Sequence, residues 1–121
     1  TDEIISYNAC NTAHSLGAAA IVAFTQSGST AGRVSKYRPR VPILAITPNS
    51  IVSRRLLLRW GVYPLQQGSP SSVDELFTTA SRLSKDLELS KPGDLIVITA
   101  GIPLGETGST NLLKVHKIDW S

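Results

Sequence analysis

The segment from Thr25 to Thr30 carries residue types that could bind an anion. It reads Thr25, Gln26, Ser27, Gly28, Ser29 and Thr30, and it leads from a short apolar run into a predicted helix. Backbone N–H groups and the positive end of a helix attract phosphate, and four hydroxyl groups add donors. Gly28 allows a close backbone approach or a positive φ. The spacing is not that of a Walker loop, so the segment predicts another kind of phosphate site or an ordinary capped turn.

A second loop, residues 100–111, has the composition of a flap. It contains Gly101, Gly105 and Gly108 together with four small polar residues, among them Thr107. Such a loop could close over a ligand, or it could only reverse the chain between two strands. Loops of this length without secondary structure are uncommon in compact domains, which favours the functional interpretation.

The other residues with chemical potential form no catalytic set. Cys10 and His14 lie four residues apart on a predicted helix, but two ligands do not make a metal site, so we expect structural roles for both. His116 is expected to be exposed on an edge strand. The sequence shows no Ser-His-Asp set, carboxylate pair or H-E-x-x-H motif. We therefore expect neither catalytic residues nor a metal site in this chain.

The basic residues are unevenly distributed. No acidic residue occurs between Ile4 and Val73, a stretch that contains seven bases: Arg33, Lys36, Arg38, Arg40, Arg54, Arg55 and Arg59. They are either the solvated ends of helices or a face that attracts an anion. The few aromatic residues do not interleave with these bases as a stacking platform would, so nucleic acid is not the expected partner.

Length and composition indicate a single domain over residues 1–121. With 41% hydrophobic and 17% charged residues, the chain is not a disordered tail. Its apolar runs are far shorter than the ~20 residues of a spanning helix, and no signal peptide precedes them. The single cysteine excludes a disulfide framework. We expect a soluble, cytoplasmic domain without membrane contact. Because the chain starts at Thr1 and enters a helix at once, it resembles a piece of a longer protein.

The candidate loops must be positioned by alternating helices and strands. Apolar periodicity and Gly, Pro and capping signals predict helices over residues 3–16, 30–37, 49–60 and 72–89, and strands over 20–25, 41–47, 62–66, 95–99 and 112–118. Asn49 is expected to cap the third helix, with Val52, Leu56 and Trp60 on one helical face. A capping box, Ser72 with Glu75, opens the fourth.

This order of elements predicts an α/β fold with three layers. Strands separated by helices favour right-handed crossovers and a parallel sheet covered on both faces. No helix separates the last two strands, so the final strand should run antiparallel at an edge. Ligands bind beyond the carboxyl ends of strands in such sheets. The loops that follow Thr25 and Thr99 should therefore lie side by side.

Several blocks of the sequence resemble the C-terminal domain of pyruvate kinase, of the bacterial type. The blocks that carry the resemblance are 17–22, 25–31, 34–39, 42–49, 60–64, 93–99 and 108–111, and they follow the family's order and spacing. The resemblance implies a five-stranded mixed sheet with strand order 3-2-1-4-5 and an antiparallel strand 5. It also implies that the catalytic barrel and lid domains are absent from this chain.

The resemblance also implies a regulatory function. The parent enzyme transfers a phosphoryl group from phosphoenolpyruvate to ADP with Mg2+ or Mn2+ and K+, and none of these ions is expected in this domain. The family's effector-phosphate loop corresponds to Thr25–Thr30 and its effector flap to Gly101–Gly108. The domain should pack on the parent catalytic domain and help to assemble a homotetramer through the edge strand at 112–118.

Two departures bear on the effector. Eukaryotic members that bind fructose 1,6-bisphosphate carry basic residues where this chain has Gln26 and Ser29. They also use a tryptophan and an arginine near the second phosphate, and this chain has no tryptophan between Val62 and Asp119. A single-phosphate effector, AMP or a sugar phosphate, therefore fits the loop better. Two other readings stay open: a stand-alone protein that binds phosphorylated ligands with the same fold, and a purely structural assembly domain whose loop is empty.

Overall fold

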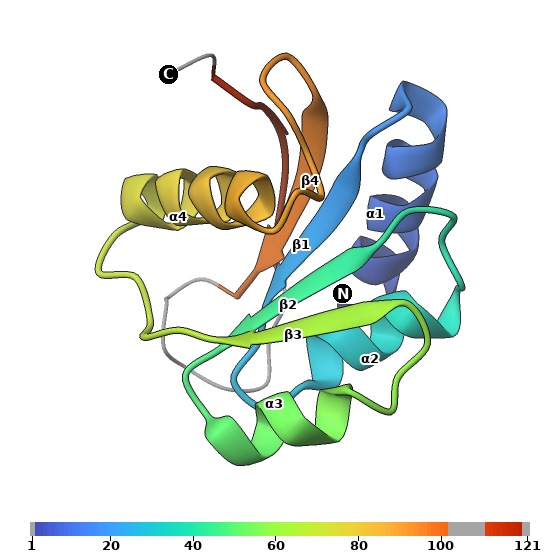
Figure 1. Ribbon diagram of the computed structural model, residues 1–121. Coiled ribbons are helices and arrows are strands. Elements are labelled where there is room, and N and C mark those ends of the chain that lie inside the picture. The colour runs from blue at the N-terminus through green and yellow to red at the C-terminus, as the bar shows by residue number, and fades with distance from the viewer. Residues whose placement is uncertain (1, 102–110, 120–121) are drawn as a thin grey trace.

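The computed structural model describes residues 2–101 and 111–119 and contains the predicted alternation of helices and strands (Figure 1). The helices are α1 (Asp2–Leu16), α2 (Ser29–Lys36), α3 (Ser50–Leu56) and α4 (Val73–Asp86), and the strands are β1 (Ala20–Phe24), β2 (Ile43–Thr47), β3 (Val62–Gln66), β4 (Leu95–Ala100) and β5 (Leu112–Lys117). Every predicted element is present. No helix in the described ranges is long and apolar enough to cross a membrane.

The five strands form one mixed sheet in the order β3-β2-β1-β4-β5. β1 pairs in parallel with both β2 and β4, β2 pairs in parallel with β3, and β5 runs antiparallel to β4. The predicted strand order and the predicted direction of the last strand are both confirmed. The two edge strands are β3, which tolerates Pro64 for that reason, and β5.

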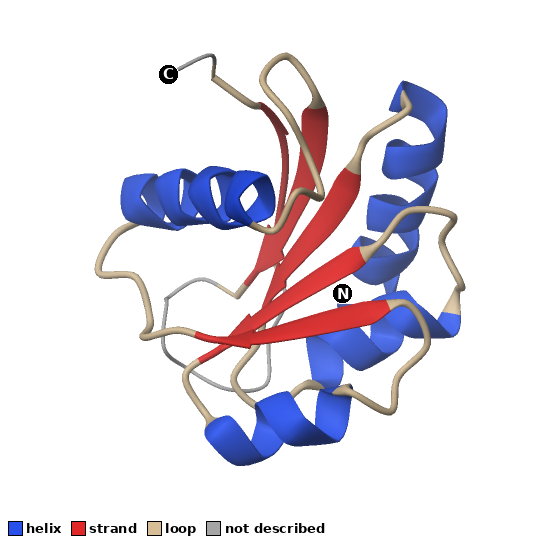
Figure 2. Ribbon diagram, viewed as in Figure 1, coloured by secondary structure: helices blue, strands red, loops and turns tan. Residues whose placement is uncertain are grey.

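Helices cover both faces of this sheet, which gives the three predicted layers (Figure 2). The helices α1, α2 and α3 lie on one face, where Ala13, Val34 and Leu56 pack in one apolar cluster with Ile21 and Ile43. On the other face α4 contributes Leu76, Ala80 and Leu83 to a second cluster. Successive residues of β1 alternate between the two clusters because side chains of a strand point to opposite faces.

Both predicted helix caps are present, one of them in altered form. The Asn49 Oδ1 accepts hydrogen bonds from the N–H groups of Ile51 and Val52 at 2.9 and 3.1 Å. The Ser72 Oγ accepts from the Glu75 N–H at 3.1 Å. The Glu75 carboxylate accepts in return from the Ser71 N–H, also at 3.1 Å, and not from the N-cap residue as a regular capping box would.

The third helix is shorter than predicted. It ends at Leu56, and the next turn is held by bonds from the Leu57, Leu58 and Arg59 N–H groups to carbonyls three residues back. Such tighter bonds change the rotation per residue. Trp60 is therefore not on the buried stripe, and its residue exposure is 46%. The predicted face holds only Val52 and Leu56.

Candidate anion-binding site

The loop Thr25–Thr30 follows β1 at the carboxyl edge of the sheet. The Thr25 N–H donates to the Ile46 carbonyl of β2 at 2.9 Å, which extends the ladder by one residue. On the other side, Ala23 of β1 is in register with Thr99 of β4. The ends of β1 and β4 thus lie side by side, as predicted for the strands that precede the two candidate loops.

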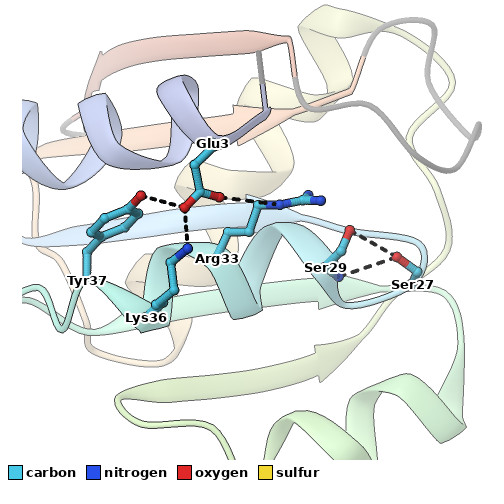
Figure 3. A network of polar contacts seen from close by, with 6 residues as sticks. All are labelled: Glu3, Ser27, Ser29, Arg33, Lys36 and Tyr37. Atoms are coloured by element: carbon cyan, nitrogen blue, oxygen red, sulfur yellow. Dashed lines mark hydrogen bonds and ion pairs between the residues drawn. The ribbon is translucent and has the colours of Figure 1, made fainter.

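Two hydroxyl groups of the loop accept bonds from its own backbone. The Gly28 N–H donates to the Thr25 Oγ1 at 2.8 Å, and the Ser29 N–H donates to the Ser27 Oγ at 3.3 Å. The Ser27 Oγ also donates to the Ser29 Oγ at 3.1 Å (Figure 3). We call the first two bonds the internal loop bonds. They occupy two N–H groups at the start of α2 that could otherwise donate hydrogen bonds to a bound anion.

Gly28 is required by both the backbone and the packing of this turn. It has φ of 90°, a conformation that residues with a Cβ rarely adopt. A Cβ at this position would lie 3.2 Å from the Val52 Cγ1 and 3.5 Å from the Leu56 Cδ2. The loop therefore lies directly against α3.

The remaining loop residues differ in exposure. Ser27 and Ser29 are exposed, whereas Thr25 and Thr30 are buried. The Gln26 Nε2 donates to the Ser69 Oγ at 3.2 Å, which connects the loop with the segment between β3 and α4. The exposed hydroxyls are thus at the middle of the loop, where a ligand from solvent can reach them.

Two arginines lie beside this loop, and the sequence alone did not place them there. A cavity of about 310 Å3 is lined by Ser27, Gly28, Ser29, Val52, Arg55, Leu56 and Arg59. The strand order provides the missing signal: β1, β2 and β3 are successive neighbours, so right-handed crossovers put α2 and α3 on the same face. The side chains of α3 can therefore reach the start of α2.

A charged cluster connects α1 with the other end of α2 (Figure 3). The Glu3 carboxylate accepts from the Lys36 Nζ and the Tyr37 hydroxyl and lies 3.7 Å from the Arg33 Nε. The bond from Lys36 and the bond from Tyr37 lower the pKa of Glu3. The same contact with Glu3 raises the pKa of Lys36. This cluster joins two helices and lies apart from the loop.

The predicted flap falls mostly outside the described residues. Gly101 directly follows β4 and is half-buried, and the Asn111 N–H donates to the Ala100 carbonyl at 3.1 Å. This hydrogen bond lies at the base of the loop. Gly105, Thr107 and Gly108 lie outside the described ranges, so the flap stays a prediction.

Two of the weaker candidates have structural contacts. The Cys10 Sγ contacts the Val34 carbonyl at 3.6 Å, and burial raises its pKa to about 11. The His14 Nε2 accepts from the Arg40 N–H at 3.0 Å. These contacts support the structural interpretation of both residues, which stays a prediction.

His116 is not an exposed residue, contrary to expectation. It is half-buried, and its ring centroid lies 6.2 Å from that of Phe77 on α4. The N-terminal half of α4 therefore covers this part of β5. Burial, with the nearby Lys114 charge, lowers the pKa of His116.

A mixed sheet with helices on both faces, and with a hydroxyl-rich loop at the carboxyl end of its central strand, defines this chain as a three-layer α/β domain. Residues 3–116 match the family model described as "Pyruvate kinase, alpha/beta domain". The chain therefore belongs to this family, and its resemblance to the C-terminal domain of bacterial pyruvate kinases is confirmed.

Individual relatives agree with the family model. The chain is 50% identical to a pyruvate kinase of Geobacillus stearothermophilus over 116 residues, 96% of this chain and 20% of that protein. It is 42% identical to one of Clostridium acetobutylicum over 119 residues, 98% of this chain and 25% of that protein. A pyruvate kinase of Staphylococcus aureus is 43% identical over 114 residues. The chain thus spans a fifth to a quarter of the length of these relatives.

Proposed function

We propose that this chain is the effector-binding and assembly domain of a pyruvate kinase. The parent enzyme would transfer a phosphoryl group from phosphoenolpyruvate to ADP in the cytoplasm, with Mg2+ or Mn2+ and K+ bound outside this domain. The observation that carries the regulatory part is the Thr25–Thr30 loop, which presents exposed hydroxyls at the start of α2 beside Arg55 and Arg59.

This loop has the chemistry to bind a phosphate. When a phosphate arrives, the Ser27 side chain can rotate away and leave the Ser29 N–H to the ligand, since that internal loop bond is long at 3.3 Å. The hydroxyl groups of Thr25, Ser27 and Thr30 can add donors. The positive end of α2 and the two arginines favour a dianion over a neutral group.

A ligand with one phosphate fits the loop better than a bisphosphate. Gln26 is neutral, and its amide is already engaged with Ser69. Ser29 is neutral as well, so no cation is contributed from within the loop. We therefore propose AMP or a sugar monophosphate as the effector. Such a ligand regulates the parent enzyme only if it binds the active and inactive states with different affinity.

The substitution Ser27→Asp tests this proposal. It places a carboxylate where the phosphate should bind, and like charges at hydrogen-bond distance repel each other. We expect titration calorimetry with AMP and ribose 5-phosphate to show binding to the unchanged chain and none to the variant. Fructose 1,6-bisphosphate, titrated in parallel, should bind more weakly than the preferred monophosphate.

Ser50→Asp is the matched control, because Ser50 is an exposed serine in the first turn of α3 and gains the same charge. It should bind the effector as the unchanged chain does. Wild-type affinity in Ser27→Asp would show that the loop is only a helix cap and would remove the regulatory part of the proposal.

The assembly part rests on the outer edge of β5, which pairs with no other strand among the described residues. The Ile118 N–H donates to the Asp94 carbonyl across the ladder, and antiparallel ladders alternate inward and outward N–H groups. By that alternation the His116 and Lys114 N–H groups face β4, and the Val115 and Leu113 N–H groups face outward. An outward row of donors and acceptors is a template for a second strand. We propose that β5 of a second copy pairs with it.

A further inference from the structure

A larger cavity lies between α2 and the turn that follows α3. Its volume is about 650 Å3, and its lining includes Gly32, Arg33, Lys36, Arg38, Arg59 and Trp60. This volume is typical of pockets that hold small molecules, which run from roughly 300 to 1,000 Å3. The cavity shares Arg59 and Ser29 with the smaller one beside the loop, but the rest of its lining is separate.

The lining of this cavity is strongly basic. Four of its lining residues are cations, and none of the acidic residues that the structure describes lines it. The Glu3 carboxylate of α1 meets two of them, Lys36 and Arg33. In the described part of the chain, Arg38 and Arg59 form no ion pair with an acid. Cations gathered in a concave site focus a positive potential there and attract anions.

The walls of the cavity are held in place by specific contacts. The Ser35 Oγ donates to the Trp60 carbonyl at 2.6 Å, which fixes the turn after α3 against α2. The Arg38 guanidinium lies 5.6 Å from the Trp60 ring centroid, a distance typical of a cation–π contact. These two contacts thus hold the turn after α3 against α2 and hold the Arg38 guanidinium beside the Trp60 ring.

Gly32 makes room for the Arg59 side chain against α2. A Cβ built at Gly32 would lie 3.4 Å from both the Cζ and the Nη2 of Arg59. The guanidinium therefore rests directly on the backbone of α2, where a larger side chain would displace it. A guanidinium held in one place can form paired hydrogen bonds with phosphate oxygens.

We propose that this cavity binds a small molecule with two neighbouring phosphoryl groups. Cations from α2 and from the turn after α3 line the same cavity, so two phosphates in one molecule can each meet a guanidinium. The half-exposed Trp60 ring offers an apolar surface for the uncharged part of the ligand. This inference does not rest on the proposed effector loop, because Arg38, Lys36 and Trp60 do not line the cavity beside that loop.

Inorganic pyrophosphate is the probe that tests this site. The chain has two tryptophans, so a Trp120→Phe background leaves Trp60 as its only one and makes its emission a local reporter. Titration should change that emission in a saturable way and release or absorb heat at the same concentrations. Arg59→Gln should weaken binding by about tenfold to a hundredfold, as expected for a lost bond to a charged group.

Two further variants make the test specific. Arg54→Gln removes an exposed arginine of α3 that does not line the cavity, and it should bind pyrophosphate as the background protein does. Gly32→Leu fills the floor of the larger cavity, and because leucine favours helices, α2 should stay intact by circular dichroism. This variant should abolish the Trp60 response.

The proposal is overturned if millimolar pyrophosphate leaves the Trp60 emission unchanged. It is also overturned if folded Gly32→Leu or Arg59→Gln binds pyrophosphate as tightly as the background protein. Loss of binding in both variants with retention in Arg54→Gln supports it, whatever the outcome of the Ser27→Asp experiment.

Discussion

Gly28 meets two separate structural requirements at the start of α2, and a residue with a Cβ at this position would lower the stability of the fold through each of them. One is the positive φ of 90°; the other is the close approach of Val52 and Leu56. Gly61 meets only the first, because it has φ of 69° and nothing lies within 4 Å of its Cβ position. The two glycines therefore allow the costs to be measured apart.

We expect Gly61→Ala to destabilise the fold by about 1–2 kcal/mol, the cost of a left-handed residue with a Cβ. Gly28→Ala should cost more, since it adds the contact with the Val52 methyl group at 3.2 Å. Urea unfolding followed by circular dichroism measures both free energies. Equal losses in the two variants would mean that α3 moves aside without cost.

Cys10 is expected to be unreactive in the folded chain. It is 3% exposed, and burial raises its pKa to about 11, so almost no thiolate forms at neutral pH. A thiol reagent such as Ellman's reagent should label Cys10 only as fast as the protein opens, and at full rate in denaturant. Rapid labelling of the native chain would contradict the burial of α1 against α2.

At the scale of elements, β5 pairs with β4 on one side and, within the described ranges, with no strand on the other. Proline at Val115 removes an N–H group that faces outward, whereas proline at His116 removes one that faces β4. We expect Val115→Pro to weaken self-association of the chain while the fold persists. Sedimentation velocity measures the association, and circular dichroism monitors the fold.

His116→Pro is the matched comparison, and it should destabilise the fold itself, because a bond to β4 is lost. If Val115→Pro folds and still associates as the unchanged chain does, the β5 edge is not the contact between copies.

The half-burial of His116 predicts a pH dependence of stability. Burial lowers the pKa of His116 below its ordinary value of 6.5, so the unfolded chain binds the proton more readily than the folded one. The contribution is therefore fully present above pH about 6.5 and is lost as the pH falls through the lower folded pKa. The urea midpoint should decrease over that window.

The His116→Gln variant should show a smaller decrease over the same window. Lys114→Gln should also reduce the decrease, because the Lys114 charge contributes to the lowered pKa. An unchanged slope in His116→Gln would show that another group controls the transition.

The elements differ in how far the sequence alone predicts them. Runs such as Leu95–Thr99 and capped helices such as the one after Ser72 carry strong local signals, and both are confirmed. The predicted end of α3 was wrong because Trp60 keeps the four-residue spacing of a regular helix from Leu56. That spacing gives no sign in the sequence that the turn between the two residues is tighter. The loop at Thr25 was identified by composition. The neighbourhood of Arg55 and Arg59 depends on tertiary packing and has no local signal.

At the scale of the whole molecule, we expect this chain alone to have no kinase activity. It spans only a fifth to a quarter of the pyruvate kinases it matches, and the described residues hold no group of three His, Cys, Asp or Glu that could bind a metal ion. Phosphoryl transfer needs positioned metal ions and cationic clamps. A coupled assay with phosphoenolpyruvate, ADP, Mg2+ and K+ should give the blank rate. Turnover above the blank rate would contradict the expectation if a control preparation, purified in the same way but without this chain, shows none.

The internal loop bonds have a consequence for which anions the loop accepts. An incoming ion must replace the Thr25 and Ser27 oxygens that already accept bonds from the Gly28 and Ser29 N–H groups. The free energy of binding is therefore the difference between the bonds that the ion forms and the two bonds that it breaks. Chloride carries a single charge, so it gains less from these N–H groups and from the nearby Arg55 and Arg59 than a phosphate dianion with several acceptor oxygens does. The internal loop bonds should therefore disfavour monovalent anions more than a phosphate dianion. Effector affinity should accordingly be the same in chloride and in acetate salts of equal ionic strength.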